Sequence, residues 1–289
     1  MSKVLNIIDV QHLYYKYKFT HLAGNLKELT YLDRDITLLY YPLREIELIA
    51  QMGEINTAIC FNSKVNAYKE ALDTMRENRM SSLKQSDFTN LAEIQEMLNA
   101  VGYSTYSIED QEVNYMVASV CKKCYLSYNE IHIYTQDSNL LQLVCDKVTV
   151  HLYKQRKGYI EINKDNFEDI VSQLFKVYIP FNALGLYKAM CGDKSDKLNV
   201  IKGIKGFGPA SFTSWVGKHP DLPYAHCTNP NHIWKILTTH FEGEKLEQAL
   251  IALNKVALHT FDIEKMPQYT GTPSTRVEIY NQYGMQSLI

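Results

Sequence analysis

The residues most able to do chemistry in this chain are carboxylates that follow apolar runs. Asp9 ends the strand-length run VLNIID, and Asp137 comes two residues after EIHIYT. Asp193 and Asp196 lie three residues apart in GDKSD, after an apolar helical run. Ligands bind beyond the carboxyl ends of the strands in open α/β sheets, so we expect Asp9 and Asp137 at that edge, with the acid pair packed over it. Converging carboxylates repel one another unless cations neutralise them, which predicts a site for Mg²⁺ or Mn²⁺.

Glu112 is a further acid of this set, because it opens the predicted helix EVNYMVASVCKKCYLS. A carboxylate in the first turn of a helix is also stabilised by the helix dipole, which is the structural alternative. Two divalent ions held by such acids can clamp an in-line phosphodiester hydrolysis, activating water and stabilising the leaving oxygen. Acids at strand ends are common in α/β folds, so the pattern by itself leaves both interpretations open.

A glycine-rich turn, KGIKGFGP, follows the second acid pair. Glycine tolerates positive φ and close backbone approach, so N–H groups of the turn can point at an anion, and the proline opens a helix whose N-terminus faces the same place. The two lysines favour a phosphodiester over a neutral ligand. The predicted DNA-backbone contacts are Lys202, Gly203, Lys205, Gly206 and Gly208. The alternatives are an ordinary αα-hairpin with glycine caps, and a Rossmann turn, which needs a preceding strand that KLNVIK fits poorly.

A basic segment precedes these motifs. Lys69, Arg76 and Arg79 lie in NAYKEALDTMRENR, and the polar stretch SSLKQSD follows. Beside a sheet edge, such a segment can steer or clamp a phosphate backbone, whereas a solvated helix face is an equally good interpretation of the charges.

The elements that must position these residues alternate between strand and helix in the first part of the chain. Strand-like, helical and again strand-like runs at 4–10, 42–53 and 56–62 predict a parallel sheet. Two further strands, at 147–152 and 158–162, are expected to form a hairpin. The pattern becomes helical near residue 165. We therefore predict an α/β domain over 1–164 and a helical part over 165–289.

Composition limits the classes of function. The 289 residues are 46% hydrophobic, which is ample for a core, and the formal net charge of −2 requires any nucleic-acid surface to be local. Six cysteines without a disulfide-framework spacing favour a reducing cytosol, and Cys121-Lys-Lys-Cys124 is at best half of a zinc site. No signal peptide and no 18-residue apolar run is present, so we expect no membrane anchor. The cysteine usage agrees with a cytoplasmic location, and we expect a monomer.

Several motifs together resemble the 5′ nuclease family: bacteriophage 5′→3′ exonucleases, the 5′ nuclease domain of bacterial DNA polymerase I, and flap endonucleases. GDKSDKLNVIKGIKGFGPAS is similar to the family's GDxSDNIPGVxGIGxKTA, and TQDSNLLQL to SxDxDxxQL. The stretch FNSKVNAYKEALDTMRENR resembles the family's FDxxxxxxFRxxLxxxYKxxR. The stretch IIDVQHLYY is similar to the family's N-terminal strand with its acid, and EVNY followed by ASVCKK is similar to the family's EADD helix. The resemblance covers nearly the whole chain.

This resemblance implies a PIN-like α/β fold, a parallel-sheet core with helices on both faces. It also implies a basic arch near 63–88 and a helical subdomain with a helix-hairpin-helix near 186–217. By the same resemblance, Lys69, Arg76 and Arg79 position the scissile phosphate, K⁺ binds at the helix-hairpin-helix, and the partner is DNA with a 5′ flap, a branch or a 5′ end. The host would be a bacterial or phage-infected cell. The implied ligands of Mg²⁺ or Mn²⁺ are Asp9, Glu112, Asp137, Asp193 and Asp196.

The chain departs from the family at four acidic positions. Asn62, Asn114, Tyr115 and Asn139 stand where the family has acids. An amide oxygen can ligate a hard cation but brings no charge, so these changes are expected to weaken Mg²⁺ binding and to leave one metal site in place of two. Two hypotheses follow: a structure-selective 5′→3′ exonuclease or flap endonuclease with weakened activity, or a nuclease-dead homologue that binds branched or 5′-ended DNA.

The last residues form a motif of their own. Gln282 to Ile289, QYGMQSLI, loosely resembles a sliding-clamp-binding peptide, a glutamine followed by spaced apolar residues. The alternative is a segment packed on the body of the protein.

Overall fold

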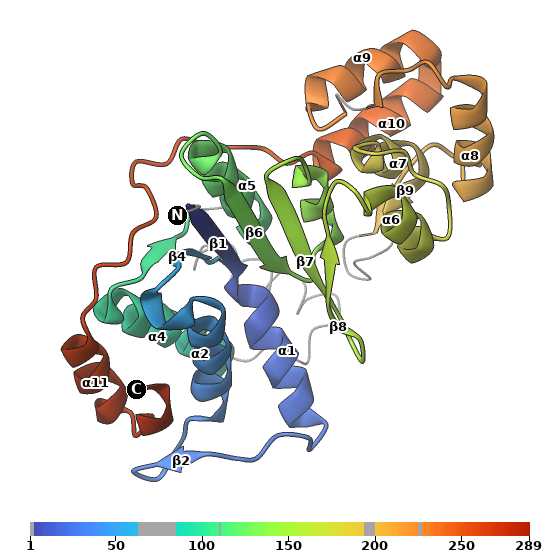
Figure 1. Ribbon diagram of the computed structural model, residues 1–289. Helices are drawn as coiled ribbons and strands as arrows, with labels where there is room; N and C mark the ends of the chain where they lie inside the picture. The colour runs from blue at the N-terminus through green and yellow to red at the C-terminus, as the bar shows by residue number, and fades with distance from the viewer. Residues whose placement is uncertain (1–2, 63–84, 110, 194–199, 225–226) are drawn as a thin grey trace. The chain divides into compact units, whose positions relative to one another are not determined.

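The computed structural model describes residues 3–62, 85–109, 111–193, 200–224 and 227–289 (Figure 1). The contacts divide the chain into two compact units. Unit 1 comprises Met1–Thr135 with Thr260–Ile289, and unit 2 comprises Gln136–His259. The sequence-predicted boundary near residue 165 falls between two elements of unit 2. The units are therefore described separately.

Unit 1 is an α/β unit built on parallel strands in the order β5-β4-β1-β6, as the alternating pattern predicts. Strand β1 has apolar residues on both sides because helices cover both faces of this sheet. Ile8 belongs to the core formed with α1, α2 and α4, whereas α5 contacts β1 and β4 and is absent from that core. The elements are β1 (Val4–Asp9), α1 (Val10–Leu22), β2 (Thr30–Tyr31), β3 (Arg34–Asp35), α2 (Thr37–Ile49), η1 (Gln51–Gly53), β4 (Asn56–Cys60), α4 (Gln85–Val101), β5 (Ser104–Tyr106), α5 (Val113–Cys124), β6 (Glu130–Thr135), α11 (Pro273–Gln282) and η4 (Gln286–Leu288).

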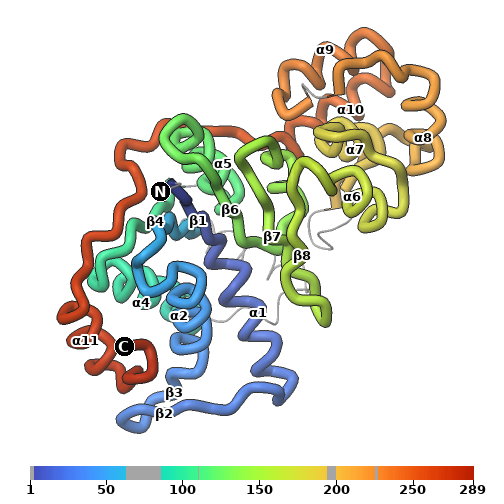
Figure 2. The backbone as a smooth tube through the Cα atoms, viewed as in Figure 1, coloured from blue at the N-terminus to red at the C-terminus, as the bar shows by residue number. Residues whose placement is uncertain are grey.

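The last thirty residues of the chain complete unit 1. The segment before α11 is hydrogen-bonded to residues that precede β5 and β6: the Thr270 N–H donates to the Gly102 carbonyl at 2.9 Å, and the Tyr128 hydroxyl donates to the Pro267 carbonyl at 3.2 Å. Figure 2 shows this return and the packing of α11 against α4. Tyr280 and Met285 enter the same core as α2 and α4, so this segment is an integral part of unit 1.

Unit 2 begins with the short helix η2, followed by a β-hairpin and then by helices. Strands β7 and β8 pair antiparallel, which confirms the predicted hairpin. The two-residue strands β9 and β10 also pair antiparallel and link α7 to α8. The elements are η2 (Ser138–Leu143), β7 (Val148–Lys154), β8 (Gly158–Ile162), α6 (Phe167–Phe175), α7 (Leu184–Cys191), β9 (Gly192–Asp193), β10 (Ile201–Lys202), α8 (Pro209–Lys218), α9 (Pro230–His240) and α10 (Gly243–Val256).

None of the helices in the described part of the chain combines the length and the hydropathy that a membrane span requires. All six cysteines are unbridged.

Candidate functional site

Asp9 is the last residue of β1, where its carboxylate is only 3% exposed. Its Oδ1 accepts the His12 N–H at 3.1 Å, which caps α1, and its Oδ2 accepts the Thr135 hydroxyl at 2.8 Å. Thr135 ends β6, the strand beside β1. A buried carboxylate needs such donors to offset its lost hydration. The predicted strand-end acid is therefore held rigidly at the carboxyl edge of the sheet.

The N-terminus of α5 is fixed at the same edge. Cys60, the last residue of β4, lies opposite Asp9, and two residues later Asn62 accepts the Val113 N–H at 2.6 Å through Oδ1. This bond caps the helix, while Glu112 occupies the N-cap position without a capping bond of its own. Asp9, Asn62 and Glu112 thus come together around one end of the parallel strands. Burial, and next the Asp9 carboxylate, raises the pKa of the Cys60 thiol.

The two remaining family-divergent positions on α5 have local structural roles. Asn114 is 7% exposed, and its Oδ1 accepts the Tyr115 N–H at 2.8 Å. The Tyr115 ring lies edge-on to Phe261, with 6.5 Å between the ring centroids. Tyr115 therefore packs against the returning C-terminal segment, which an acid at this position would not do.

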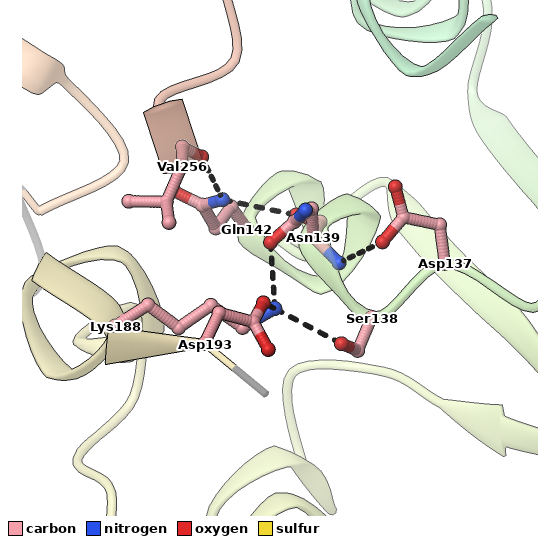
Figure 3. A network of polar contacts seen from close by, with 7 residues as sticks. All are labelled: Asp137, Ser138, Asn139, Gln142, Lys188, Asp193 and Val256. Atoms are coloured by element: carbon pink, nitrogen blue, oxygen red, sulfur yellow. Dashed lines mark hydrogen bonds and ion pairs between the residues drawn. The ribbon is translucent and has the colours of Figure 1, made fainter. Parts of the chain in front are cut away.

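In unit 2 the predicted residues Asp137, Asn139 and Asp193 belong to one polar network (Figure 3). Asp137 caps η2 by accepting the Asn139 N–H at 2.8 Å. The network is centred on Lys188, whose Nζ lies 2.7 Å from Asp193 Oδ2, 2.6 Å from Asn139 Oδ1 and 2.9 Å from Ser138 Oγ. Lys188 comes from α7 and is fully buried.

The surroundings of this network are rigid and positively charged. Gln142 Nε2 donates to the carbonyls of Asn139, at 3.1 Å, and Val256, at 2.9 Å, which ties η2 to α10. Burial lowers the pKa of Lys154, the nearby Lys188 ammonium lowers it further, and Asp137 opposes the shift. Two lysines therefore stand beside the predicted acids.

The glycine turn after Asp193 forms the predicted link between two helices. Ile204 is buried, and its N–H donates to the Met190 carbonyl at 2.8 Å, which anchors the turn to α7. Lys202 and Lys205 are exposed beside it. Gly208 is the N-cap of α8, which begins with Pro209 as predicted. The short strand β10 lies before the glycines, where a Rossmann turn would require a strand. It pairs antiparallel with β9 and does not belong to a parallel sheet.

Glycine is favoured at two positions of this turn for different structural reasons. A Cβ on Gly203 would lie 2.3 Å from the Gly192 nitrogen and 2.4 Å from the Met190 carbonyl oxygen, so a larger residue cannot fit. Gly206 has a φ of +77° in open space, where only its backbone conformation favours glycine. The turn is thus a close contact between two backbone segments that keeps its lysines outside.

A cavity of about 610 Å³ lies between the network and the glycine turn, within unit 2. Its lining includes residues of the network, residues of the turn with the α8 N-terminus, and aromatic side chains. The lining residues are Ser138, Leu152, Lys154, Leu174, Phe175, Tyr187, Cys191, Gly192, Asp193, Phe207, Gly208 and Pro209.

Four predicted site residues, Lys69, Arg76, Arg79 and Asp196, lie outside the described residues. Among the described residues, no three histidine, cysteine, aspartate or glutamate side chains form a preassembled metal site. The oxygen-only donors Asp9, Glu112 and Asp137 nevertheless have the chemistry that Mg²⁺ and Mn²⁺ prefer.

Sequence reasoning missed Lys188 and the two hydroxyls, Thr135 and Ser138. The signal for Lys188 was present: it is the one charged residue in the apolar helix LGLYKAMC, where a lysine requires a buried partner. The hydroxyls carry no such signal, because serine and threonine are frequent at strand ends and helix caps.

The clamp-like tail is folded onto unit 1. Met285 is 1% exposed and Leu288 is 2% exposed, and both belong to the core with α2 and α4. Met285 and Leu288 are therefore not presented to a partner in this structure, whereas Ile289 is 43% exposed.

No family model matches the chain. It is 24% identical over 161 residues to a 5′-3′ exonuclease of Mycoplasmopsis pulmonis and 28% identical over 152 residues to a 5′-3′ exonuclease of Mycoplasma pneumoniae. These matches cover 55% and 52% of this chain, and 50% of each relative, so the matched region spans about half the length of these curated relatives. The thermostable DNA polymerase I of Thermus thermophilus is 25% identical over 202 residues, 68% of this chain and 22% of that protein.

Solved structures show the same fold over almost the whole chain. The bacteriophage T5 D15 flap endonuclease, in a pseudo-enzyme–product complex with DNA and metal ions, superposes with a TM-score of 0.60 at 16% identity, covering 99% of this chain and 95% of that chain. The catalytic core of Rad2 with DNA substrate gives 0.54 at 15% identity, covering 98% and 87%. The sequence relatives and the shared fold together support the resemblance of this chain to 5′ nucleases.

Proposed function

We propose that this chain is a divalent-metal-dependent 5′ nuclease that hydrolyses phosphodiester bonds in 5′-flapped, branched or 5′-ended DNA. The observation that carries the proposal is the convergence of Asp9, Asn62 and the α5 N-terminus with Glu112 at one end of the parallel strands. Asp137 follows Thr135, the hydroxyl partner of Asp9, by two residues. Asp193 and Asp196 complete the predicted ligand set.

When bound, a divalent ion at these carboxylates would lower the pKa of a water molecule and neutralise charge on the phosphate. The chain's own residues would do the rest. Asp9 is oriented by its two hydrogen bonds, so its carboxylate cannot rotate freely. The exposed Lys202 and Lys205 beside the glycine turn would hold the DNA backbone without reading its sequence, as K⁺ bound at this turn would also help to do. Lys69, Arg76 and Arg79 remain the predicted residues for positioning the scissile phosphate.

The test is cleavage of a 5′-labelled flap DNA in Mg²⁺ and in Mn²⁺. We expect Asp137→Asn to reduce cleavage by about 100-fold or more, because it removes a metal-ligand charge but keeps an oxygen for the Asn139 N–H. Asp146→Asn is the matched control, since Asp146 is a 71% exposed acid of the same unit, and should cleave as the parent does. Absence of cleavage by the parent, or equal cleavage by Asp137→Asn, refutes the proposed activity.

The second candidate is a nuclease-dead DNA-binding homologue. It is favoured by one observation, the Lys188 ammonium held between Asn139 and Asp193 where the family has a metal-binding acid. Salt-dependent binding that prefers flap DNA to a single strand of equal length, without any cleavage, would support it. A sliding-clamp contact is not part of either candidate, because Met285 and Leu288 are buried.

A further inference from the structure

The ammonium of Lys188 is coordinated in the way that a small bound cation would be. An ammonium has three N–H donors, and three oxygens, from Asp193, Asn139 and Ser138, lie 2.6 to 2.9 Å from Nζ. All the donors of this fully buried group are therefore matched by acceptors. Figure 3 shows the three acceptors converging on the end of the lysine side chain.

The lysine is held at this point by its stem as well as by its head. Residues 184–190 of α7 are all buried, so the aliphatic part of Lys188 is enclosed along its length. The Phe175 ring faces the ammonium, with its centroid 5.7 Å from Nζ. Moving the charge away would break its 2.7 Å ion pair with the Asp193 carboxylate, which is 7% exposed. Breaking such a buried pair is strongly unfavourable.

The charges of the three acceptors fit one positive charge. Asp193 contributes one negative charge, whereas Asn139 and Ser138 are neutral, so the ammonium balances the group. An aspartate at position 139 would add a second negative charge and would then favour a divalent ion. The neutral amide of Asn139 therefore matches the single positive charge of the buried Lys188.

We propose that the Lys188 ammonium takes the place of one divalent cation in this chain, so that Asp193 and Asn139 hold a built-in monovalent charge rather than a metal ion. This inference rests on the proposed function and narrows it: the chain binds one catalytic divalent ion, at the predicted acids of unit 1, Asp9 and Glu112. A second divalent ion between Asn139 and Asp193 would have to displace the ammonium, or lie against it and be repelled.

The experiment counts bound Mn²⁺ by calorimetry and by the electron paramagnetic resonance signal of the free ion, without DNA. The parent and Asn139→Asp, which keeps the lysine, should each bind one Mn²⁺. The double variant Lys188→Met/Asn139→Asp should bind one more ion than the parent, because it exchanges the ammonium for a carboxylate. Lys164→Met is the control: this lysine of unit 2 is 51% exposed and should leave the count unchanged.

Any of three results overturns the inference. The parent binds two ions, Asn139→Asp alone gains an ion, or the double variant gains none although it unfolds cooperatively and is therefore folded. If the double variant does not fold, the counts for the parent and Asn139→Asp decide. The proposed function fails separately. If the parent binds no Mn²⁺ and does not cleave DNA, the proposed nuclease activity is refuted. A gain of one bound ion in the double variant would still support the role of Lys188.

Discussion

The ion pair between Glu47 and Arg276 should carry a large share of the stability of unit 1. Glu47 of α2 is 2% exposed and Arg276 of α11 is 8% exposed, with 3.1 Å between Oε2 and Nη2. Glu47 also accepts the hydroxyls of Tyr103, at 2.6 Å, and Tyr280, at 2.5 Å. Replacing Glu47 with leucine removes all three interactions and leaves the buried guanidinium without its counter-charge.

The expected loss in free energy of unfolding is about 3 to 5 kcal/mol for Glu47→Leu, because removal of one partner of a buried pair costs this much. Arg276→Met should cost a similar amount. The double variant Glu47→Leu/Arg276→Met should lose less than the sum of the two, because neither charge is then left alone. Arg34→Met is the matched control: its partner is also a glutamate of unit 1, but Arg34 is 46% exposed, so the loss should stay below about 1 kcal/mol.

The assay is urea unfolding followed by far-ultraviolet circular dichroism, with the midpoint and slope fitted for each variant. Limited proteolysis of the chain after residue 260 gives a second measurement, since Arg276 holds α11 on α2. A loss of less than about 0.5 kcal/mol for Glu47→Leu, or a double variant as unstable as the sum, would show that the pair is not what holds the segment.

The remaining predictions concern the glycine turn and the thiols. Gly203→Ala should reduce DNA binding and lower the melting temperature, because its methyl group would meet backbone atoms of the α7 end; equal binding and melting would contradict this. Lys202→Gln and Lys205→Gln should each weaken flap binding and reduce the slope of log K against log salt by about 1, measured by fluorescence anisotropy; an unchanged slope removes that lysine from the interface. Burial raises the pKa of Cys191 and Cys227 to about 12. Because these thiols ionise first in the unfolded chain, the stability that they contribute is complete below about pH 8.5 and should fall as the pH rises toward 12; an alkaline urea series that shows constant stability would refute this.

The sequence predicted the residues at strand ends better than their partners. Apolar runs ending in Asp9 and followed by Asp137 indicate strands, and the structure confirms the parallel strands of unit 1. Strand β1 is buried on both faces, whereas β6 alternates between buried and more exposed residues. The position of Asn62 after β4 was also predictable, but its use as a cap for α5 was not. That bond joins residues 51 positions apart, and no local pattern specifies it.

The Lys188 network shows why the rest of the site was out of reach. A lysine in an apolar helix indicates a buried cation, but the identity of its partners depends on tertiary packing. Asn139 and Lys188 are 49 residues apart, and a spacing of this kind has no periodicity to detect. Comparison with the family motif does not reveal this network either. It counts Asn139 as a missing acid, and it gives no information on Lys188, the lysine proposed to take the place of a metal ion.

Unit 1 is assembled from two stretches of chain with the whole of unit 2 between them. Its core therefore cannot close when β6 emerges from the ribosome, because Tyr280 and Met285 are made after unit 2. Until then α2 and α4 expose the apolar surface that α11 will cover, and Glu47 has no arginine. We expect the polypeptide to acquire unit 2 as an independent hairpin-and-helix module first, and unit 1 to reach its final stability only when α11 docks. Docking of the segment that starts at Thr260 is therefore expected to be the last step in the folding of unit 1.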